Sequence, residues 1–301
     1  MKKLIVLLLA FTFFSCSKSD KPQSSNADKT KEPVEVSKET PKESPKAPDP
    51  NDPNKNIYGY YSGDFKAVKY NENKDISYIN RITISLDSII NNSVYGHSVV
   101  AGNNRPFKGT YNSKGNELVV DAKEPGDDKY DGTFSFTVRP ASNEITGKWT
   151  SFNKNSDVTV REYDLKKKEF TYNSDLKMPE DVAWTFLYDQ NAKKFETEGE
   201  KGESLTEDVI KVNASKKLLT KNEVENMHKG DLEIIRNSIY ARHGYSFKNR
   251  RIRFVFDQYV DWYMPVSTDV SKELTEVEQK NIDLLKRYEQ HAEKYYDDFG
   301  R

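Results

Sequence analysis

The chain has 301 residues, in which 47 Lys and Arg are balanced by 48 Asp and Glu. This balance excludes a general electrostatic attraction to nucleic acid or to an anionic membrane surface, so we expect no nucleic-acid partner. The 18 Tyr, 15 Phe and 3 Trp exclude a wholly disordered chain, because a chain without a core lacks such side chains.

Residues 1–16 are predicted to form a signal peptide. Lys2 and Lys3 supply the positive start, and residues 4–14 form a nearly unbroken apolar run. The run is shorter than the ~20 residues that a membrane-spanning helix needs. It ends at Cys16, the only cysteine, so the chain can form no internal disulfide.

The ending Phe13-Phe14-Ser15-Cys16 resembles the lipobox of bacterial lipoproteins, with Phe13 where leucine is usual. The resemblance implies that Cys16 becomes a new N-terminus carrying three acyl chains, palmitate among them. It also implies an extracytoplasmic protein of the cell envelope, lipid-anchored to a membrane, for which we expect the outer membrane. The alternative is an ordinary signal peptide with a chance cysteine.

Residues 17–56 are predicted to be a disordered tether. They contain no Phe, Trp or Tyr but hold seven of the twelve prolines, and their charges cancel. Such a segment cannot bury enough apolar surface to offset the entropy lost on ordering. Its Pro, Lys, Glu and Ser content favours an extended spacer between the anchor and the folded part.

Residues 57–165 are predicted to form an antiparallel β domain. Ile82, Ile84 and Leu86 alternate with Thr and Ser, and the same period of two recurs in residues 134–138. Short turns and the lack of a long amphipathic helix predict a meander, closed into a barrel or folded as a sandwich. We expect strands near 57–67, 78–88, 93–101, 105–112, 116–122, 130–139, 144–152 and 157–165.

A Gly-x-aromatic pattern recurs in this domain, beginning at Gly59, Gly109, Gly132 and Gly147. Glycine within a strand often indicates a bulge or a sharp bend, after which an aromatic ring can fill the end of a barrel. The pattern resembles the small lipocalin-like barrels of bacterial lipoproteins. An eight-stranded barrel can fill its interior with side chains or hold one small apolar ligand, and both alternatives stay open.

Residues 166–212 are predicted to be a connector, in which 182–188 form a strand or a segment packed on the barrel. Residues 213–301 change to a helical period. Thr220 and Glu223 have the spacing of a capping box, and Asp231 is a candidate N-cap for the next helix. Further helices are expected over 249–259 and after a second capping box at Thr275 and Glu278, which opens a long helix with an apolar stripe that reaches Tyr295. The fold class is therefore α+β as separate domains, with an all-β antiparallel barrel or sandwich followed by an all-α small helical bundle.

Tyr240-Ala241-Arg242-His243-Gly244 resembles the pentapeptide after which the bacterial YARHG domain family is named. Residues 237–239, Phe247, Asn249, 262–265 and 274–278 stand where that family has similar elements. The resemblance implies an extracytoplasmic domain, often joined to other envelope modules. It implies no particular reaction.

Tyr240, Arg242, His243 and Gly244 are interpreted as structural. Gly244 is expected to end the helix in a left-handed conformation, and the two cations suit the negative end of the helix dipole. We expect His243 to bind main-chain carbonyls and Arg242 to pair with Asp257 or Asp261. The alternative is a working site that uses His243 as an acid or base, or as a ligand for an anion, beside Arg242. Catalysis needs a converging second group, and no nucleophile motif, phosphate loop or zinc motif accompanies the pair. No catalytic residue, metal site or cofactor is therefore predicted.

The sequence predicts a non-enzymatic binding or scaffold module, lipid-anchored in the cell envelope, with a cell-wall, glycan or protein partner. The alternatives are a carrier of a small apolar ligand in the barrel and an enzyme that uses the helical domain. An apolar cavity favours the carrier, a cleft uniting His243 with carboxylates favours the enzyme, and exposed aromatic patches favour the binding module.

Overall fold

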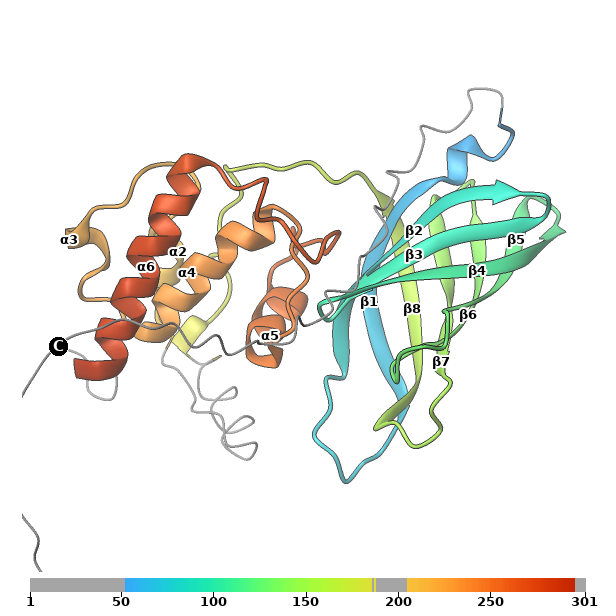
Figure 1. Cartoon of the computed structure of the whole chain (residues 1–301), viewed down its shortest axis with the longest axis horizontal. Coiled ribbons are helices and arrows are strands. Elements are labelled where there is room, and N and C mark those ends of the chain that lie inside the picture. Colours follow the sequence, from blue (N-terminus) through green and yellow to red (C-terminus); the bar gives the residue numbers. More distant parts are fainter. Residues whose placement is uncertain (1–51, 186, 188–204, 296–301) are drawn as a thin grey trace, which may run out of the picture. The chain divides into compact units, whose positions relative to one another are not determined.

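The computed structural model describes residues 52–185, 187 and 205–295, which form a β-barrel followed by a helical region (Figure 1). Cys16, the expected signal peptide and almost all of the expected tether lie outside the described residues. The strands are β1 Gly59–Tyr70, β2 Ile79–Ile90, β3 Ser93–Val100, β4 Asn103–Lys114, β5 Glu117–Lys123, β6 Gly132–Arg139, β7 Glu144–Ser151 and β8 Val158–Lys168. The helices are η1 Lys55–Ile57, α2 Asp208–Lys211, α3 Lys221–Val224, α4 Lys229–Arg242, α5 Arg250–Tyr259 and α6 Glu276–Tyr295.

The eight strands form a closed antiparallel barrel in chain order. Each strand pairs with the next, and β1 returns to pair with β8 from Tyr60 opposite Lys168 to Tyr70 opposite Val158. Closure leaves no strand edge open to another chain. The all-β fold is confirmed, and of the two predicted architectures the structure has the barrel.

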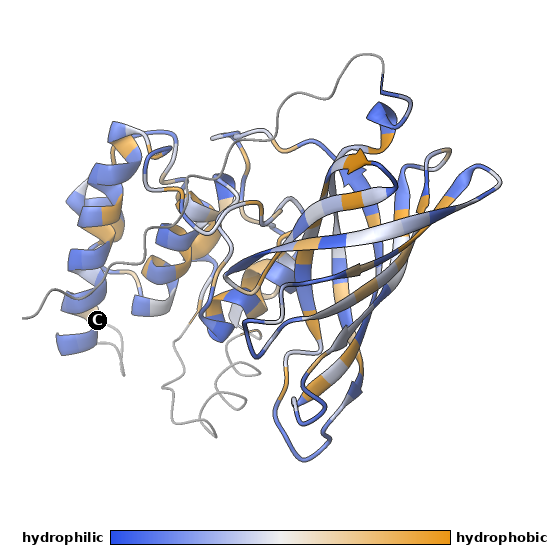
Figure 2. Cartoon of the chain, turned by 45° about the vertical axis from the view of Figure 1, so that its right-hand side comes forward, coloured by the Kyte–Doolittle hydropathy of each residue, from blue (hydrophilic) through white to orange (hydrophobic). Residues whose placement is uncertain are grey.

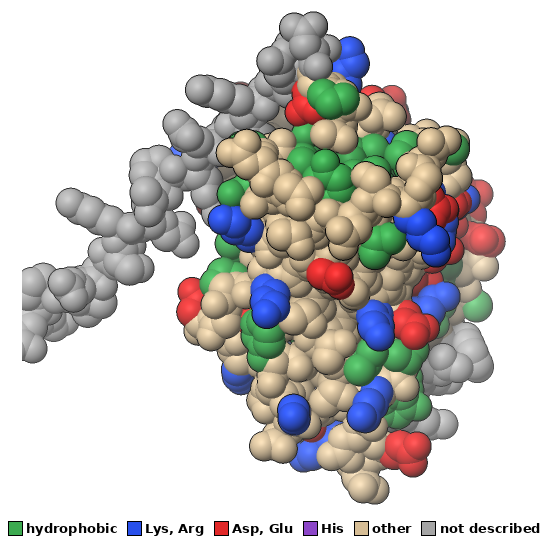
Figure 3. Space-filling model, turned by 90° about the vertical axis from the view of Figure 1, so that its right-hand side faces the viewer, with side chains coloured by type: hydrophobic (Ala, Val, Ile, Leu, Met, Phe, Trp, Pro, Cys, Tyr) green, Lys and Arg blue, Asp and Glu red, His purple; other side chains and the backbone are tan. Residues whose placement is uncertain are grey.

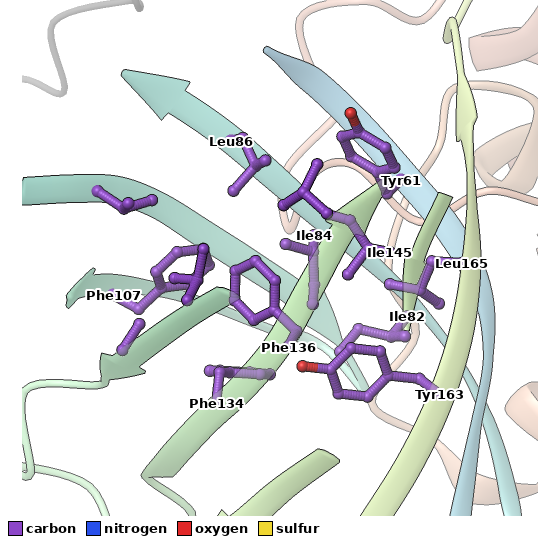
Figure 4. Close-up of a cluster of buried hydrophobic side chains, with 14 of the residues drawn as sticks. Tyr61, Ile82, Ile84, Leu86, Phe107, Phe134, Phe136, Ile145, Tyr163 and Leu165 are labelled. Carbon is purple, nitrogen blue, oxygen red and sulfur yellow. The ribbon is translucent and has the colours of Figure 1, made fainter. Parts of the chain in front are cut away.

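Apolar side chains from all eight strands fill the barrel interior. In β6, Phe134, Phe136 and Val138 are buried, whereas Ser135 and Thr137 between them are partly exposed. The close-up in Figure 4 shows these rings and the neighbouring aliphatic side chains pointing toward one another, and Figure 2 shows the corresponding alternation along the strands. Of the two predicted interiors, the packed one is therefore present.

Three glycines of the Gly-x-aromatic pattern, at positions 109, 132 and 147, allow close approach of the neighbouring strand. A Cβ added to Gly132 would lie 2.6 Å from the Trp149 indole, and one on Gly147 would lie 2.5 Å from Phe136 Cβ. The register shifts of the sheet occur instead between Ala67 and Lys69, Lys69 and Tyr70, and Leu86 and Ser88. A bulge at these glycines is therefore wrong, and the alternative of a sharp bend stays a prediction. Gly132 is needed because the Trp149 ring occupies the space of its side chain, whereas at Gly109 and Gly147 the backbone of the adjacent strand lies there.

The helical region buries two apolar clusters. One gathers α2, α5 and the adjoining turns around Phe256 and Tyr263, and the other lies between α4 and α6 around Ile239 and Leu285. Trp184 is fully buried in the first cluster, and residues 184 and 185 are helical. The expectation of a strand or a barrel-packed segment at 182–188 is thus wrong for the residues described. The apolar spacing there is too short to separate a strand from a helical turn.

Helix α4 begins earlier than predicted, because His228 is its N-cap residue and not Asp231. Asp231 lies in the first turn, where its carboxylate accepts hydrogen bonds from the Thr206 amide at 2.7 Å and the Thr206 hydroxyl at 2.8 Å. Burial raises the pKa of Asp231 to about 7. An aspartate near a helix start can accept hydrogen bonds from a distant segment or from the first amides of its own helix, and sequence spacing alone does not distinguish these two roles.

Hydrogen bonds join the helical region to the barrel at β2, at the β3–β4 turn and at the β1–β2 loop. Arg81 of β2 donates from Nη2 to the main-chain oxygen of Asp257 in α5 at 3.1 Å, and the main chain of Arg81 hydrogen-bonds the Asp257 carboxyl in return. The amide of Gly102, in the β3–β4 turn, donates to Ser246 Oγ at 2.9 Å. The side chain of Asp257 is therefore directed to the barrel and not to Arg242.

Candidate functional site

The pentapeptide at residues 240–244 lies where α4 ends. Tyr240, Ala241 and Arg242 form the last turn, and His243 is the C-cap residue. Gly244 has a φ of 73°, and its amide donates to the carbonyl of Ala241 at 2.9 Å. This left-handed conformation favours glycine, which has no Cβ to clash with the following carbonyl. The predicted left-handed stop is therefore present at Gly244.

His243 is paired with Glu278, a residue 35 positions further along the chain. His243 Nε2 lies 2.8 Å from Glu278 Oε2, and the two side chains are 4% and 0% exposed. Thr275 completes the cluster, since its amide and hydroxyl donate to the same carboxylate at 2.9 and 3.0 Å. The expectation that His243 binds main-chain carbonyls is thus corrected. Its partner is a carboxylate at the start of α6.

Hydrogen bonds keep Glu278 ionised. Burial raises the pKa of this carboxyl, but donors on His243, Ser215 and Thr275 outweigh it and bring the pKa to about 2. An ionised carboxylate only accepts hydrogen bonds, so Nε2 of His243 carries the proton and donates it.

Tyr172 covers the other side of this pair. Its ring stacks on the His243 imidazole at a centroid distance of 4.2 Å and an interplanar angle of 17°. Its hydroxyl donates to Glu278 Oε1 at 3.1 Å. The expected connector between the two domains thus supplies part of the cluster.

Arg242 is almost completely buried, with 1% of its surface exposed. It donates from Nε and Nη2 to the carbonyl of Leu176 at 2.9 and 2.8 Å, and from Nη1 to Ser238 Oγ at 2.7 Å. Burial lowers its pKa to about 10. The predicted pairing with Asp257 or Asp261 is wrong. The guanidinium group instead donates to a main-chain carbonyl of the connector. The spacing of residues along α4 cannot predict a partner in another segment.

Tyr240 and Gly244 complete the motif by packing. Tyr240 is partly buried and contacts both apolar clusters of the helical region. A Cβ added to Gly244 would lie 2.4 Å from Val266 and 2.8 Å from Phe170. The glycine is therefore required for space as well as for its backbone conformation.

Imidazole, carboxylate and phenol groups are those that acid–base catalysis uses. Here they are buried and bonded to one another, so a substrate would have to displace the partners that hold them. In the ranges 52–185 and 205–295, no group of three or more His, Cys, Asp or Glu is arranged to hold a metal ion. What the cluster can do is hold the end of α4, the start of α6 and the connector together.

Sequence reasoning missed most of the partners in this cluster. Glu278 was visible only as a capping-box residue, and Tyr172, Leu176 and Ser215 lay in or near a stretch interpreted as a connector. The aromatic residue at 172 was a weak signal, since a wholly solvated connector would not need it.

Exposed aromatic side chains form a second candidate site, on the barrel. Tyr78 precedes β2, Tyr130 lies between β5 and β6, and Phe152 follows β7, and they are 51%, 61% and 43% exposed. We call these three side chains the aromatic loop surface. Figure 1 shows the β1–β2 and β7–β8 loops at the lower end of the barrel.

The three loops that carry these residues are hydrogen-bonded side by side. The amide of Asn71 donates to the carbonyl of Asp157 at 2.7 Å, which joins the β1–β2 and β7–β8 loops. The amide of Phe152 donates to the carbonyl of Asp131 at 3.0 Å, which joins the β7–β8 and β5–β6 loops. The sequence gives no sign of this surface, because the pairing of β6 with β7 brings the loops of Tyr130 and Phe152 together and closure of the barrel adds the loop of Tyr78.

Residues 207–290 match the family model of the YARHG domain. The chain thus combines an eight-stranded antiparallel barrel with a YARHG domain, a module typical of extracytoplasmic proteins. No curated protein matches the chain. Crossing a membrane takes a longer or more apolar helix than any formed by the residues described.

Proposed function

We propose that this protein is a non-enzymatic binding module of the cell envelope, held on a membrane by lipid on Cys16. The observation that carries the binding role is the aromatic loop surface, where three neighbouring loops each expose one large ring. Exposed aromatic side chains on adjoining loops are typical of sites that bind a partner.

Two observations weigh against the alternatives. A carrier of an apolar ligand needs an open interior, whereas rings such as Phe107, Phe134 and Phe136 lie against one another in the barrel. An enzyme of the YARHG domain needs accessible acid–base groups, whereas His243 and Glu278 are buried and paired. The motif is therefore assigned a structural role, and the binding role is assigned to the barrel.

The location rests on two features. The YARHG domain is typical of extracytoplasmic proteins, and the apolar run before Cys16 resembles a lipoprotein signal. A multiply acylated N-terminus anchors stably, since each buried CH₂ contributes ~0.8 kcal/mol. The outer membrane is the proposed site. On the face seen in Figure 3, positive and negative side chains are interspersed, so a partner held by charge alone is not proposed.

The test is capture from envelope extracts by immobilised residues 17–301. A triple variant with Tyr78→Ala, Tyr130→Ala and Phe152→Ala should lose the retained glycan or protein. The matched control replaces three exposed apolar residues elsewhere, Ile90, Leu218 and Tyr295, which are 56%, 52% and 62% exposed. The control should retain it. Equal retention by both variants, or none by the unaltered chain, would contradict a binding role for this surface.

A further inference from the structure

We propose that the aromatic loop surface binds a neutral glycan chain. This inference rests on the binding function proposed above and names the ligand class. The C–H faces of sugar rings are apolar and pack on aromatic rings, while their hydroxyl groups need hydrogen-bonding side chains nearby. The surface supplies both kinds of contact.

The Tyr78 ring contacts another ring, and hydrogen bonds fix the backbone at Tyr130 and Phe152. Tyr78 contacts Tyr70 edge to face, with centroids 5.1 Å apart and an interplanar angle of 82°. The amide of Tyr130 donates to Asp128 Oδ1 at 2.8 Å, and that of Phe152 donates to the carbonyl of Asp131. A platform whose backbone is fixed in this way loses little conformational entropy when a ligand stacks on it.

Exposed amide side chains belong to two of the same loops. Asn71 Oδ1 accepts from the amide of Asn73 at 3.0 Å, and Asn153 Oδ1 accepts from the amide of Asn155 at 3.0 Å. These four residues are exposed. Because the oxygens of Asn71 and Asn153 hold the turns, their NH₂ groups are the donors available to ligand hydroxyl groups.

The exposed charges of the three loops and of the two arginines paired with them are close to balance, which is the reason for choosing a neutral ligand. Asp75 pairs with Arg250 of α5, and Asp127 pairs with Arg105 of β4. The other exposed residues of these loops carry three negative and three positive charges, on Glu72, Asp128, Asp157, Lys74, Lys129 and Lys154. Two further carboxylates of the β5–β6 loop, Glu124 and Asp131, are buried, and Asp131 also binds Arg105. A polyanion or polycation would gain little from such a surface, whereas an uncharged polymer needs no excess of one sign.

The fourth loop at this end of the barrel is not part of the surface. Gly102 in the β3–β4 turn donates to Ser246 of the helical region, and a Cβ on Gly102 would lie 2.1 Å from Lys248 Cγ. The helical region thus contacts the β3–β4 turn, and Asp75 of the β1–β2 loop through Arg250, and leaves the three aromatic side chains exposed.

The experiment is calorimetric titration of residues 17–301 with chitohexaose, cellohexaose and maltohexaose, and with polygalacturonate as a charged polymer. At least one neutral oligosaccharide should bind. Tyr78→Ala, Tyr130→Ala and Phe152→Ala should each weaken that binding roughly 2- to 10-fold, as expected for one aromatic contact. Tyr130→Phe should bind as the unaltered chain does, because the stacking ring remains. The Ile90, Leu218 and Tyr295 triple variant is the matched control, and unchanged melting temperatures show that each variant is folded.

Three results would overturn the proposal. One is binding that the alanine variants do not weaken, and another is binding of polygalacturonate alone. The third is failure of all three oligosaccharides at millimolar concentration. In that case the envelope capture separates the two hypotheses. Protein captured through the aromatic loop surface would refute the glycan and keep the binding function, whereas no capture would refute both.

Discussion

Glu278 completes the ends of two helices at once. Its carboxylate accepts from His243 Nε2 at 2.8 Å, at the C-cap of α4, and from the amide of Thr275 at 2.9 Å, immediately before α6. The negative charge therefore lies near the positive end of the α6 dipole and next to the donor that closes α4. Two helices that are distant in sequence are thereby fixed to one another through one side chain.

Glu278→Gln should lower the free energy of unfolding by about 1.5–3 kcal/mol at pH 7, because a hydrogen bond to a buried charge is lost. The folded pKa of Glu278 is about 2, below its ordinary value of 4.5. Its contribution is therefore complete above pH 4.5 and is lost as the pH falls toward 2. Chemical denaturation at pH 7 and pH 3 measures both effects. The control is Glu276→Gln, whose side chain is 82% exposed. A variant as stable as this control would contradict the assignment.

Arg242→Ala should destabilise the protein more than His243→Ala. Arg242 donates to Leu176, Ser238 and Ser215, and removing it leaves buried acceptors unsatisfied, at a cost of about 3 kcal/mol or more. Arg242→Lys should recover only part of this, because an ammonium cannot replace the guanidinium fork. Thermal melting and envelope capture, measured on the same variants, distinguish a structural role of Arg242 and His243 from a role in binding a partner. Unchanged melting with lost capture would make these residues part of the binding site.

Gly244→Val should destabilise the helical region by ~1 kcal/mol or more, through its left-handed backbone conformation alone. The contacts with Val266 and Phe170 should increase the loss, since a Cβ there would lie under 3 Å from both. Gly244→Ala should show a smaller effect of the same sign. Circular dichroism at the helical band measures the transition, and an unaltered midpoint in both variants would show that the tight turn is not needed.

Asp257→Asn should flatten the dependence of stability on pH. Burial raises the pKa of Asp257 to about 7 in the folded protein, although Arg253, Arg81 and Arg161 act in the opposite direction. Between pH 4 and pH 7 the unfolded chain then releases a proton that the folded chain keeps, so stability falls as the pH rises. Asparagine does not titrate. In this range the free energy of unfolding of the variant should therefore fall by up to ~1.4 kcal/mol less per pH unit than that of the unaltered chain.

Denaturation curves at pH 4.5, 5.5 and 6.5 measure this difference in slope. Asp231 and Glu124 also have pKa values raised to about 7 by burial, so they give the unaltered chain and the variant the same background slope. Asp261→Asn, at an exposed position four residues further on, is the control. Parallel curves for the unaltered chain and Asp257→Asn would show that Asp257 is ionised throughout the range.

Cys16→Ser should release the protein from membranes or leave it as an unprocessed precursor, because serine offers no thiol for the lipid. Membrane fractionation with immunodetection measures this, and Ser15→Ala is a neighbouring control that keeps the cysteine. Cys16→Ser protein of normal mature size in the membrane fraction would rule out the lipid anchor.

The local pattern was sufficient to predict both kinds of secondary structure. The period of two from Ile82 to Leu86 identified a strand, because successive side chains in a strand face opposite sides. The spacing of Thr220 and Glu223 identified a helix start, and the capping box is present. Gly244 marked a helix end because its conformation is set by its own backbone. These predictions depend on residues within a few positions of one another.

Only the tertiary structure decided which distant groups meet. Closure of β1 on β8 chose the barrel over the sandwich, since both have the same alternation along each strand. It also brought the loop of Tyr78 beside those of Tyr130 and Phe152. The partners of Arg242 and His243 likewise lie 66 and 35 residues away. A buried charge binds whichever donor or acceptor the packing of other segments places beside it, and periodicity in the sequence carries no record of that partner.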